Sequence, residues 1–388
     1  MSEKTQFYFL LTGANSGLGL SLAHRLLDDF LTTHPDNHHL TLILTTRSHS
    51  KGSATLALLS NHLHTRKVPT PRYTLAHHSV DLTNLVSVHS LAQTLYSSYP
   101  HLDAAILNAG MGTFLGIDWL NCFISLAKNW IRAVTVPTYK IQDVGCMTAQ
   151  EAPLSGESIP TVFTANVFGH YFLVHEVVDL LARGGGRIIW TSSLEAYPWA
   201  LSTDDLQGVR ASHSYESTKR LTDVLALTSG LECTSPFTAS FFCQKQSDDN
   251  IGFEKKQNQQ VPKMYVCHPG ICGTSIIPLN FILFNCMLLA FYIARWFGSP
   301  WHTISTYSGA NAASWLALAP DDELKDVQAP GIKWGSACTR SGKQMVKATD
   351  VEGEENRPEF EELGRECWKQ MEGLRMSWRE KLGQKAAQ

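Results

Sequence analysis

The sequence has no C-x-x-C pair, no cluster of cysteine and histidine at metal-ligand spacing, and no block of lysine or arginine. Its nine cysteines are scattered, and an odd, scattered set favours free thiols in a reducing compartment over a disulfide framework. The formal net charge is −3, so the charge balance gives no reason to expect a nucleic-acid partner. We therefore predict neither a bound metal nor nucleic-acid binding.

A secretory signal is also missing, because the N-terminus MSEKTQFYFLLTGANSG has no charged stretch followed by a long apolar core. We therefore expect the body of the protein to face the cytosol. What the chain does have is 388 residues, of which 44% are hydrophobic. This is enough to build one large domain or two small ones.

Short apolar runs alternate with longer amphipathic segments from residue 6 to about residue 270. This alternation predicts an α/β fold, a doubly wound parallel sheet of the Rossmann type with helices on both faces. In the helix expected after the first strand, Leu22, Leu26, Leu27 and Phe30 share one face. The strands are expected near residues 7–11, 40–45, 73–80, 103–107, 187–192 and 263–268.

One segment interrupts this alternation and two segments follow it. An insertion at 111–160 separates one strand from the next clear helix, and within it 117–134 has the apolar spacing of an amphipathic helix. Residues 276–300 contain the most apolar part of the chain, and 301–388 is expected to be a helical extension packed on the same domain. We therefore divide the chain into a Rossmann-type domain, 1–275, with its insertion, and these two further segments.

The first expected strand is followed by TGANSGLG, in which three glycines lead into a helix. Glycines let a backbone approach a pyrophosphate closely, and a helix N-terminus offers free N–H groups and partial positive charge. At the end of the second strand, where NAD-binding folds place an acidic residue, the chain has Arg47, whose guanidinium suits the 2′-phosphate of NADP. An ordinary glycine-rich turn and a solvated arginine are the alternatives. NADPH is the expected cofactor, held here by Gly13, Ser16, Gly17, Leu18, Gly19, Thr46 and Arg47.

Tyr215 and Lys219 lie four residues apart in the stretch SHSYESTKR, which is expected to be helical. Residues at this spacing share a helix face, so the ammonium can approach the phenol. A nearby cation favours phenolate and lowers the pKa of a tyrosine, which would make Tyr215 a usable general acid or base. On these two residues alone, a chance Y-x-x-x-K in a helix is the alternative.

Further motifs follow the expected strands in a fixed order: VDLTN after the third, NAG after the fourth, TSS after the fifth and HPGICGT after the sixth. With TGANSGLG, an asparagine in TANVFGHYFL and the Y-x-x-x-K pair, they resemble the short-chain dehydrogenase/reductase family over residues 6–275. The resemblance implies that the catalytic residues are Asn166, Ser193, Tyr215 and Lys219.

The resemblance also implies a role for each of these residues. Tyr215 would donate a proton to a substrate carbonyl oxygen, and Ser193 would hold that oxygen by a hydrogen bond. Lys219 would lower the tyrosine pKa and bind the nicotinamide ribose, and Asn166 would hold a water that relays the proton. Ser192 is the competing serine. Further cofactor contacts are implied for Asp81, Leu82, Asn108, Ala109, Gly110, Tyr215, Lys219 and Thr274.

The chain departs from the family pattern in the spacing from Ser193 to Tyr215, which is 22 residues here and shorter in most of the family. The extra residues predict an inserted loop between the two side chains. Such a loop leaves the assignment of the serine open and enlarges the substrate side of the site.

The apolar run at 276–297 takes the place of the family's substrate-binding loop and is more hydrophobic than a soluble lid requires. Its uninterrupted apolar part is about 14 residues, short of the roughly 20 that span a bilayer. We therefore expect an interfacial or re-entrant anchor, with Phe284, Leu288 and Phe291 in contact with the membrane and 117–134 as a second contact. A tilted span and a buried core helix are the alternatives.

The stretches SPWHTISTYSGANAASWLALAP and KWGSACTRSGK, together with the insertion, are similar to the fungal 3-keto-sterol reductases of ergosterol biosynthesis. This resemblance implies NADPH-dependent reduction of the 3-ketone of C4-demethylated sterols to the 3β-hydroxyl. It places the protein on the cytosolic face of the endoplasmic reticulum membrane or on lipid droplets. Expected partners are a sterol substrate, the membrane, the other sterol C4-demethylation enzymes and a second copy in a homodimer. A reductase of another lipophilic carbonyl, such as a 17-keto steroid, and a catalytically silent scaffold remain as alternatives.

Overall fold

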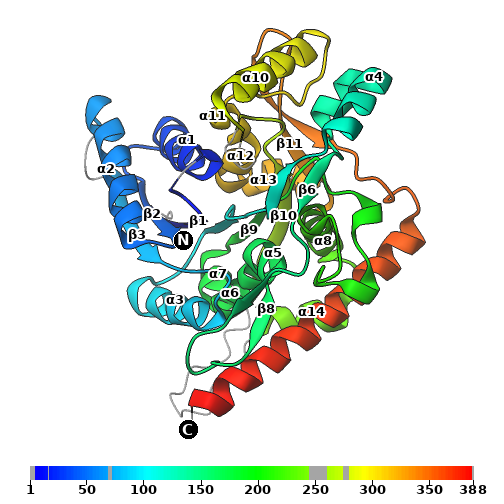
Figure 1. Cartoon of the computed structure of the whole chain (residues 1–388). Helices are drawn as coiled ribbons and strands as arrows, with labels where there is room; N and C mark the ends of the chain where they lie inside the picture. Colours follow the sequence, from blue (N-terminus) through cyan, green and yellow to red (C-terminus); the bar gives the residue numbers. More distant parts are fainter. Residues whose placement is uncertain (1–4, 16, 69–71, 244–259, 274–278, 387–388) are drawn as a thin grey trace, which may run out of the picture.

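The computed structural model describes residues 5–15, 17–68, 72–243, 260–273 and 279–386 of the chain (Figure 1). Its centre is an eight-stranded sheet of β1 (Gln6–Thr12), β2 (His39–Thr46), β3 (Tyr73–Ser79), β4 (Ala104–Leu107), β9 (Arg187–Thr191), β10 (Lys263–His268), β11 (Lys333–Cys338) and β12 (Gln344–Thr349). The strand order is β12-β11-β10-β9-β4-β1-β2-β3, and every neighbouring pair is parallel except β11 and β12.

Helices cover both faces of this sheet, as the doubly wound pattern predicts. On one face lie α1 (Gly17–Thr33), α2 (His49–Thr65) and α12 (Asn311–Leu318), and on the other α3 (Leu85–Ser98), α6 (Gly169–Glu176) and α8 (Ser214–Thr228). The remaining helices include α5 (Thr161–Phe163), a π-helix (Thr164–Phe168), α7 (Val178–Gly184), α9 (Ser235–Phe242), α10 (Phe281–Trp296), α11 (Thr306–Gly309), α13 (Asp321–Asp326) and α14 (Arg357–Ala386). Short 3₁₀ turns span Pro198–Ala200, Thr203–Asp205, Glu232–Thr234 and Ala329–Gly331.

The six predicted strands are all present, and their sequences explain why. β1 reads QFYFLLT and β2 reads HLTLILTT, near-continuous apolar runs that suit strands covered by helices on both faces. Leu22, Leu26, Leu27 and Phe30 of α1, predicted to share one face, are all buried against the sheet. The Rossmann-type architecture is therefore confirmed.

Two hydrophobic cores result, one on each face of the sheet. The core under α3, α6 and α8 includes Phe168, Trp190 and Trp368. The core under α1 and α12 includes Phe9 and Leu26. Because each face is closed by helices, the loops at the carboxyl ends of the strands are the part of the sheet left for a ligand.

The insertion forms β5 (Phe114–Ile117), α4 (Trp119–Thr135), β6 (Lys140–Gln142), β7 (Met147–Ala149) and β8 (Ser158–Pro160). β5 pairs with β6, with α4 in the connection between them, and β7 pairs with β8, so the insertion forms two small antiparallel sheets and one helix. The predicted amphipathic helix is present, but Asn129 breaks its regular geometry with φ −160° and ψ 92°.

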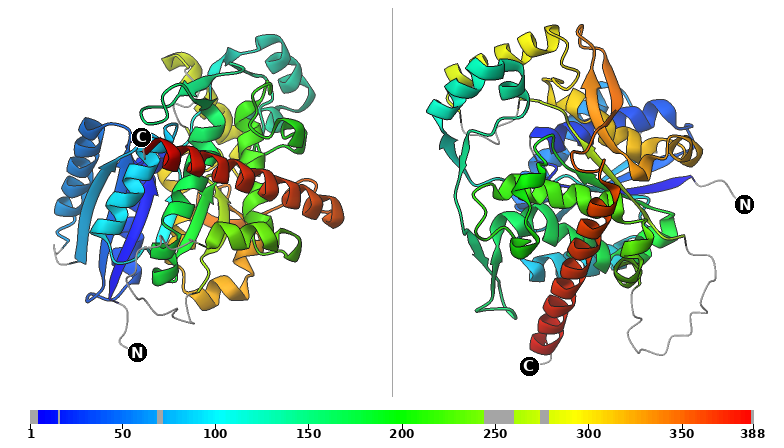
Figure 2. Two further views of the ribbon diagram at one scale, coloured as in Figure 1. Left: turned by 90° about the horizontal axis from the view of Figure 1, so that it is seen from below. Right: turned by 90° about the vertical axis from the view of Figure 1, so that its right-hand side faces the viewer.

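The C-terminal extension, predicted to be helical, also contains strands. β11 joins the parallel sheet beside β10, and β12 returns antiparallel to it and forms the sheet's edge. The long helix α14 then runs along α8 and α9 on one face of the domain (Figure 2). The prediction failed for the strands because a six-residue segment such as KWGSAC is too short to show the periodicity that separates a strand from a helix.

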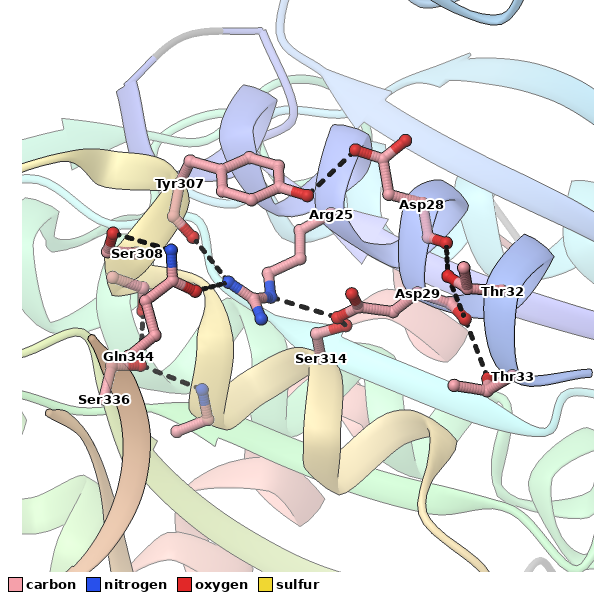
Figure 3. A network of polar contacts seen from close by, with 12 residues as sticks. Arg25, Asp28, Asp29, Thr32, Thr33, Tyr307, Ser308, Ser314, Ser336 and Gln344 are labelled. Atoms are coloured by element: carbon pink, nitrogen blue, oxygen red, sulfur yellow. Dashed lines mark hydrogen bonds and ion pairs between the residues drawn. The ribbon is translucent and has the colours of Figure 1, made fainter. Parts of the chain in front are cut away.

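The extension is also fastened to α1, the helix that follows the glycine-rich loop (Figure 3). Arg25 of α1 donates a hydrogen bond from Nη1 to the carbonyl oxygen of Tyr307, 3.3 Å away, and another to Gln344 of β12. Its Nε lies 3.0 Å from Asp29, and the Tyr307 hydroxyl donates to Asp28 over 2.9 Å. The glycine-rich loop therefore rests on a helix that the C-terminal segments brace.

The apolar run near residue 280 forms α10, which lies beside α4 at one end of the molecule (Figures 1 and 2). Trp130 of α4 meets Phe297, just after α10, edge to face with ring centroids 5.5 Å apart. Within the described ranges, none of the helices combines the length and the apolar character needed to cross a membrane.

Candidate active site

A cleft of about 720 Å³ opens at the carboxyl ends of β1, β2, β4 and β9, within the size range of small-molecule sites. It begins at the glycine-rich loop, passes α8 and ends beneath α4 and α10. Ser16 and Thr274, two of the predicted cofactor contacts, lie outside the described residues. The other predicted contacts all line the cleft: Gly13, Gly17, Leu18, Gly19, Thr46, Arg47, Asp81, Leu82, Asn108, Ala109, Gly110, Tyr215 and Lys219.

The glycine-rich turn packs too closely for side chains. Gly13 has φ 69°, and a Cβ atom there would lie 2.8 Å from Cα of Ala109. A Cβ atom on Gly19 would lie 2.0 Å from the carbonyl oxygen of Gly13. Thr12, at the end of β1, accepts hydrogen bonds at Oγ1 from the N–H groups of Asn108 and Ala109, 2.9 and 3.0 Å away. The loop and the NAG segment therefore form one rigid wall of the cleft.

This wall fits a dinucleotide. The buried Oδ1 of Asn108 and Oγ1 of Thr191 line the cleft and have no hydrogen-bond partner among the described residues, so a ligand can satisfy them. At the other end Arg47 is exposed on the rim, and Lys51 lies four residues further on in α2 and also lines the cleft. Two cations at the end of β2 would bind a 2′-phosphate better than they would bind a free ribose hydroxyl.

Lys219 is buried on α8 and reaches across to β9. Its Nζ donates a hydrogen bond to the carbonyl oxygen of Thr191 over 2.7 Å and lies 5.5 Å from the ring centroid of Tyr215. Burial is the main cause that lowers its pKa to about 8, and the neighbouring Lys333 lowers it too, while Asp223 acts in the opposite direction. The Lys219 ammonium therefore lies between Tyr215 and the end of β9, where it lines the cleft.

Two serines follow β9, and their hydroxyls make different contacts. Ser192 is buried and donates from Oγ to the carbonyl oxygen of Lys219, 3.3 Å away. The hydroxyl of Ser193 interacts with the phenol of Tyr215 and accepts from the N–H of Glu195 over 3.1 Å. The inserted loop between them therefore does not separate Ser193 from Tyr215, and Ser193 is the serine placed to share a ligand with the tyrosine.

The pKa of Tyr215 differs from the expectation. Burial raises it above the ordinary value of a phenol, the carboxylates of Glu195 and Glu216 raise it further, and the hydrogen bond with Ser193 lowers it. The prediction that Lys219 brings the pKa down took account of one cation and could not include two carboxylates that arrive from other parts of the chain. Tyr215 is therefore held as a neutral phenol, which is the form that donates a proton.

Asn166 lies in the π-helical turn before α6. Its Oδ1 accepts from the N–H of Met111 over 2.7 Å, and its Nδ2 donates to the carbonyl oxygen of Met111 and to Oγ1 of Thr218 over 2.9 and 3.0 Å. The amide thus joins the residue after NAG to the helix of Tyr215. Its role in holding a water stays a prediction.

Sequence reasoning missed several residues of the site. Lys51 had a signal, because it stands one helical turn after Arg47 in TTRSHSK. Lys140 and Glu195, which line the cleft beside Tyr215, had none, since the contact between them joins positions 55 residues apart. Lys333 contacts Ser193 across 140 positions and had none either.

The far end of the cleft is apolar and is formed by the two helices outside the sheet. α10 contributes its inward face, and α4 contributes Cys122, Leu126 and the exposed Trp119. Apolar walls with a few polar groups at the bottom suit a hydrophobic molecule with one reacting oxygen. The residues at this end include Trp119, Cys122, Leu126, Leu283, Met287, Ala290 and Phe291.

Comparison with characterised proteins gives close relatives. The chain is 41% identical to a 3-keto-steroid reductase of Aspergillus fumigatus, over 98% of this chain and 96% of that protein. It is 34% identical to a 3-keto-steroid reductase of Gibberella zeae over the same shares, and 36% identical to one of Schizosaccharomyces pombe over 89% and 90%. None of the protein-family models matches the chain.

Solved structures are more distant. Salutaridine reductase of Papaver somniferum is 16% identical, with a TM-score of 0.47 over 81% of this chain and 97% of that one. L-sorbose reductase of Gluconobacter frateurii, solved with NADPH and L-sorbose, is 14% identical, with a TM-score of 0.46 over 81% and 90%. The sequence comparison extends over nearly the full length of both chains and decides the assignment. This chain belongs to the fungal 3-keto-steroid reductases.

Proposed function

We propose that this chain is an NADPH-dependent 3-keto-sterol reductase that converts the 3-ketone of C4-demethylated sterol intermediates into a 3β-hydroxyl in ergosterol biosynthesis. The observation that carries the proposal is the near full-length similarity to 3-keto-steroid reductases at 34 to 41% identity. The cleft supports it, because one cavity joins the glycine-rich loop, Tyr215 and an apolar end.

The residues at the bottom of the cleft suit this chemistry. NADPH, when bound, supplies the hydride. Tyr215 donates its proton to the carbonyl oxygen as the carbon is reduced, and the Ser193 hydroxyl holds the same oxygen by a hydrogen bond. Lys219, charged below about pH 8, stabilises negative charge on the phenol oxygen after the transfer. Burial keeps water away from the reacting atoms, which strengthens these interactions.

The preference for NADPH is supported by the end of β2. There is no carboxylate at this turn, and Arg47 and Lys51 both line the cleft. The side chain of Thr46 donates to the carbonyl oxygen of Ser48 over 2.8 Å, which fixes the turn that presents Arg47. A guanidinium and an ammonium here would pair with a 2′-phosphate and would gain nothing from NADH.

The test is a reduction assay with purified protein in lipid vesicles, NADPH and matched substrates. A C4-demethylated 3-keto sterol should be reduced to the 3β-alcohol, and a 17-keto steroid with a 3-hydroxyl should be reduced much more slowly. Tyr215→Phe is the control for contaminating reductases. Equal turnover of the 17-ketone would favour the alternative of a broader lipophilic-carbonyl reductase, and no turnover of either would favour a silent scaffold.

We propose further that α4 and α10 place the protein on a membrane surface. Each helix lines the cleft with some side chains and exposes other apolar side chains, and Trp119 of α4 does both. Apolar patches of this kind on a soluble surface are costly and mark binding sites. The exposed set, which we call the α4–α10 patch, is Trp119, Leu120, Phe123, Ile124, Phe281, Ile282, Leu289, Tyr292, Trp296 and Phe297.

A bilayer suits this patch because a sterol is dissolved there and the apolar end of the cleft lies between the same two helices. Tryptophans at 119 and 296 have the amphipathic rings that favour a membrane interface. The proposed location is the cytosolic face of the endoplasmic reticulum membrane or lipid droplets, where sterol intermediates partition. Contacts with the other C4-demethylation enzymes and a homodimer stay predictions from the family resemblance.

A further inference from the structure

The strand pair β5–β6 of the insertion lies against the first turn of α8, which carries Tyr215. Phe114 of β5 meets the Tyr215 ring with centroids 5.4 Å apart and an interplanar angle of 60°. Nζ of Lys140, on β6, lies 4.7 Å from the Phe114 centroid and 5.3 Å from the Tyr215 centroid. Lys140 is therefore a second ammonium at the ring of Tyr215, and it comes from the insertion and not from the large sheet or its covering helices.

Gln142, two residues further along β6, completes the N-terminus of α8. His213, the N-cap residue, makes no capping hydrogen bond with its side chain. Side-chain oxygen atoms usually accept hydrogen bonds from the free backbone N–H groups at the start of a helix. Here Oε1 of Gln142 accepts from the N–H of Tyr215 over 3.0 Å and from Oγ of Ser214 over 3.2 Å, and its Nε2 donates to Glu216. The insertion thus caps the helix turn on which the candidate acid stands.

Lys140 also joins two buried carboxylates. It forms ion pairs with Glu195, in the loop after β9, and with Oε1 of Glu216 on α8, which is 3.1 Å away. The side chains of Lys140 and Glu216 are only 3% and 1% exposed, so solvent screens this cluster little. The charged or titratable groups that face Tyr215 are Lys140 from β6, Glu195 from the loop after β9, Glu216 and Lys219 from α8, and Cys272 from the loop after β10.

We propose that Lys140 and Gln142 are positioning residues for Tyr215, and that the insertion thereby becomes part of the proton-transfer machinery. Gln142 holds the helix turn, and Lys140 offsets two carboxylates that would otherwise oppose any negative charge on the phenol oxygen. The inference rests on the proposed function, in which Tyr215 is the general acid. It adds that Tyr215 acts as a general acid only with the strand pair β5–β6 in place.

The test uses oxidation of the 3β-alcohol with NADP⁺, because in this direction Tyr215 must first lose its proton. Loss of a cation disfavours the phenolate, so in Lys140→Met the rising limb of the kcat profile should move up by about one pH unit. We expect kcat at neutral pH to fall roughly tenfold, since one pKa unit is a tenfold change in the ionised fraction. KM for the sterol and the dissociation constant of NADPH should change less than about twofold, because neither ligand loses a direct contact. Lys140→Arg, which keeps the charge, should restore most of the profile.

A second variant removes the opposing charge. Glu195→Gln removes one of the two carboxylates and leaves Lys140 paired with Glu216 alone. The rising limb of this variant should therefore move to lower pH, and Lys140→Met with Glu195→Gln should return toward the wild type. This variant keeps the test decisive if Lys140→Met does not fold. The matched control is Lys381→Met, which breaks another lysine–glutamate pair of the insertion, with Glu157 at 2.8 Å, without lining the cleft.

The outcomes distinguish failure of the inference about Lys140 from failure of the proposed function. If Lys140→Met and Glu195→Gln lower thermal stability but leave the limb where it is, the cluster is only structural and the inference is overturned. If Tyr215→Phe keeps near wild-type turnover, the proposed function itself fails. Limb shifts in opposite directions for the two single variants support the inference.

Discussion

Nζ of Lys333 donates a 2.6 Å hydrogen bond to the carbonyl oxygen of Ser193. The same ammonium lies 2.6 Å from Oδ2 of Asp223, one turn after Lys219 on α8, and the two side chains are 4% and 1% exposed. Lys333 belongs to β11 of the C-terminal extension. The loop of the candidate catalytic serine and the helix of the candidate acid are therefore held together by a segment more than a hundred residues away.

Replacing Lys333 by methionine should destabilise the protein strongly. The change leaves the Asp223 carboxylate buried without its cation, which costs about 3–5 kcal/mol of the free energy of unfolding. Denaturant unfolding in detergent micelles measures the loss. Lys333→Met combined with Asp223→Asn should recover a large part of it, because no uncompensated charge remains. A loss below about 1 kcal/mol in the single variant would show that the pair is solvated and carries little energy.

Tyr215→Phe removes the proton donor and keeps the ring. We expect kcat for ketone reduction to fall by a factor of roughly 10² to 10⁴, the usual contribution of a general acid. NADPH affinity, measured by fluorescence titration, should be nearly unchanged, since the phenol reacts with the substrate oxygen. Lys219→Ala is the contrasting variant and should lose both turnover and affinity. Equal losses of affinity in the two variants would contradict the division of roles.

Arg47→Asp tests cofactor choice. A lost charge-assisted hydrogen bond costs about 1.5–3 kcal/mol, which is a roughly tenfold to hundredfold weaker NADPH affinity. NADH affinity should hold or improve, so the preference narrows or reverses. Arg365→Asp, an exposed arginine on α14 outside the cleft, is the matched control. Wild-type protein that binds NADH as tightly as NADPH would refute the assignment.

The sequence predicts most of the sheet and of the cofactor wall for one physical reason. The motifs TGANSGLG, VDLTN, NAG and TSS each follow an apolar strand, and parallel strands bring their carboxyl ends to one edge. A local pattern is enough to place Gly13, Asp81 and Asn108 in one cleft. Each of them needed only its own strand to be recognised.

The remaining parts depend on contacts that no local pattern encodes. Lys140 and Lys333 reach the site from an insertion and an extension whose packing is set by the whole fold. α10 is apolar on all sides, so periodicity cannot tell which face is buried. Phe291 is 7% exposed and its ring lies 5.4 Å from that of His302, so its predicted membrane contact is wrong.

Acid should loosen the C-terminal helix through His175. Its Nδ1 lies 2.7 Å from the carbonyl oxygen of Phe241, and its Nε2 lies 2.8 Å from Nη1 of Arg375 and 3.2 Å from Arg379, so the neutral ring accepts from two arginines. Burial, followed by the charge of Arg375, lowers its pKa to about 4. The folded state therefore resists protonation that the unfolded state accepts near pH 6.5.

The sign of the effect follows from linkage. Above about pH 6.5 the histidine is neutral in both states and costs nothing, and between about 6.5 and 4 the unfolded state binds more protons, so stability falls as pH falls. The full penalty is about 3 kcal/mol for one such ring. His175→Gln, which keeps an acceptor for Arg375, should flatten the decline in Tm between pH 6.5 and 4.5. An unchanged slope in this variant would mean that the ring is already protonated in the folded protein.

The last prediction concerns the α4–α10 patch. Phe281, Ile282 and Leu289 of α10 are 82%, 72% and 57% exposed, so replacing all three by serine removes apolar surface from the outside of the helix. If these side chains enter the membrane interface, the variant loses at least about 3 kcal/mol of transfer free energy, a roughly hundredfold weaker partition into vesicles. Co-sedimentation with phospholipid vesicles measures this partition. KM for vesicle-borne sterol should rise with it, and turnover on a small water-soluble ketone should change much less.

The matched control is Leu58→Ser, Val261→Ser and Met376→Ser, three apolar residues that are 53%, 59% and 50% exposed and lie outside the patch. It removes exposed apolar surface from other parts of the molecule and should leave sedimentation unchanged. Phe284 and Leu288 are unsuitable for this test, because a Cβ atom on Gly273 would lie 3.5 and 2.8 Å from them, so they pack on the loop after β10. If both triple variants sediment as the wild type does, the patch does not hold the protein on the bilayer. Loss of sedimentation in the α10 variant alone, with Tm preserved, identifies the outer face of α10 as the membrane contact.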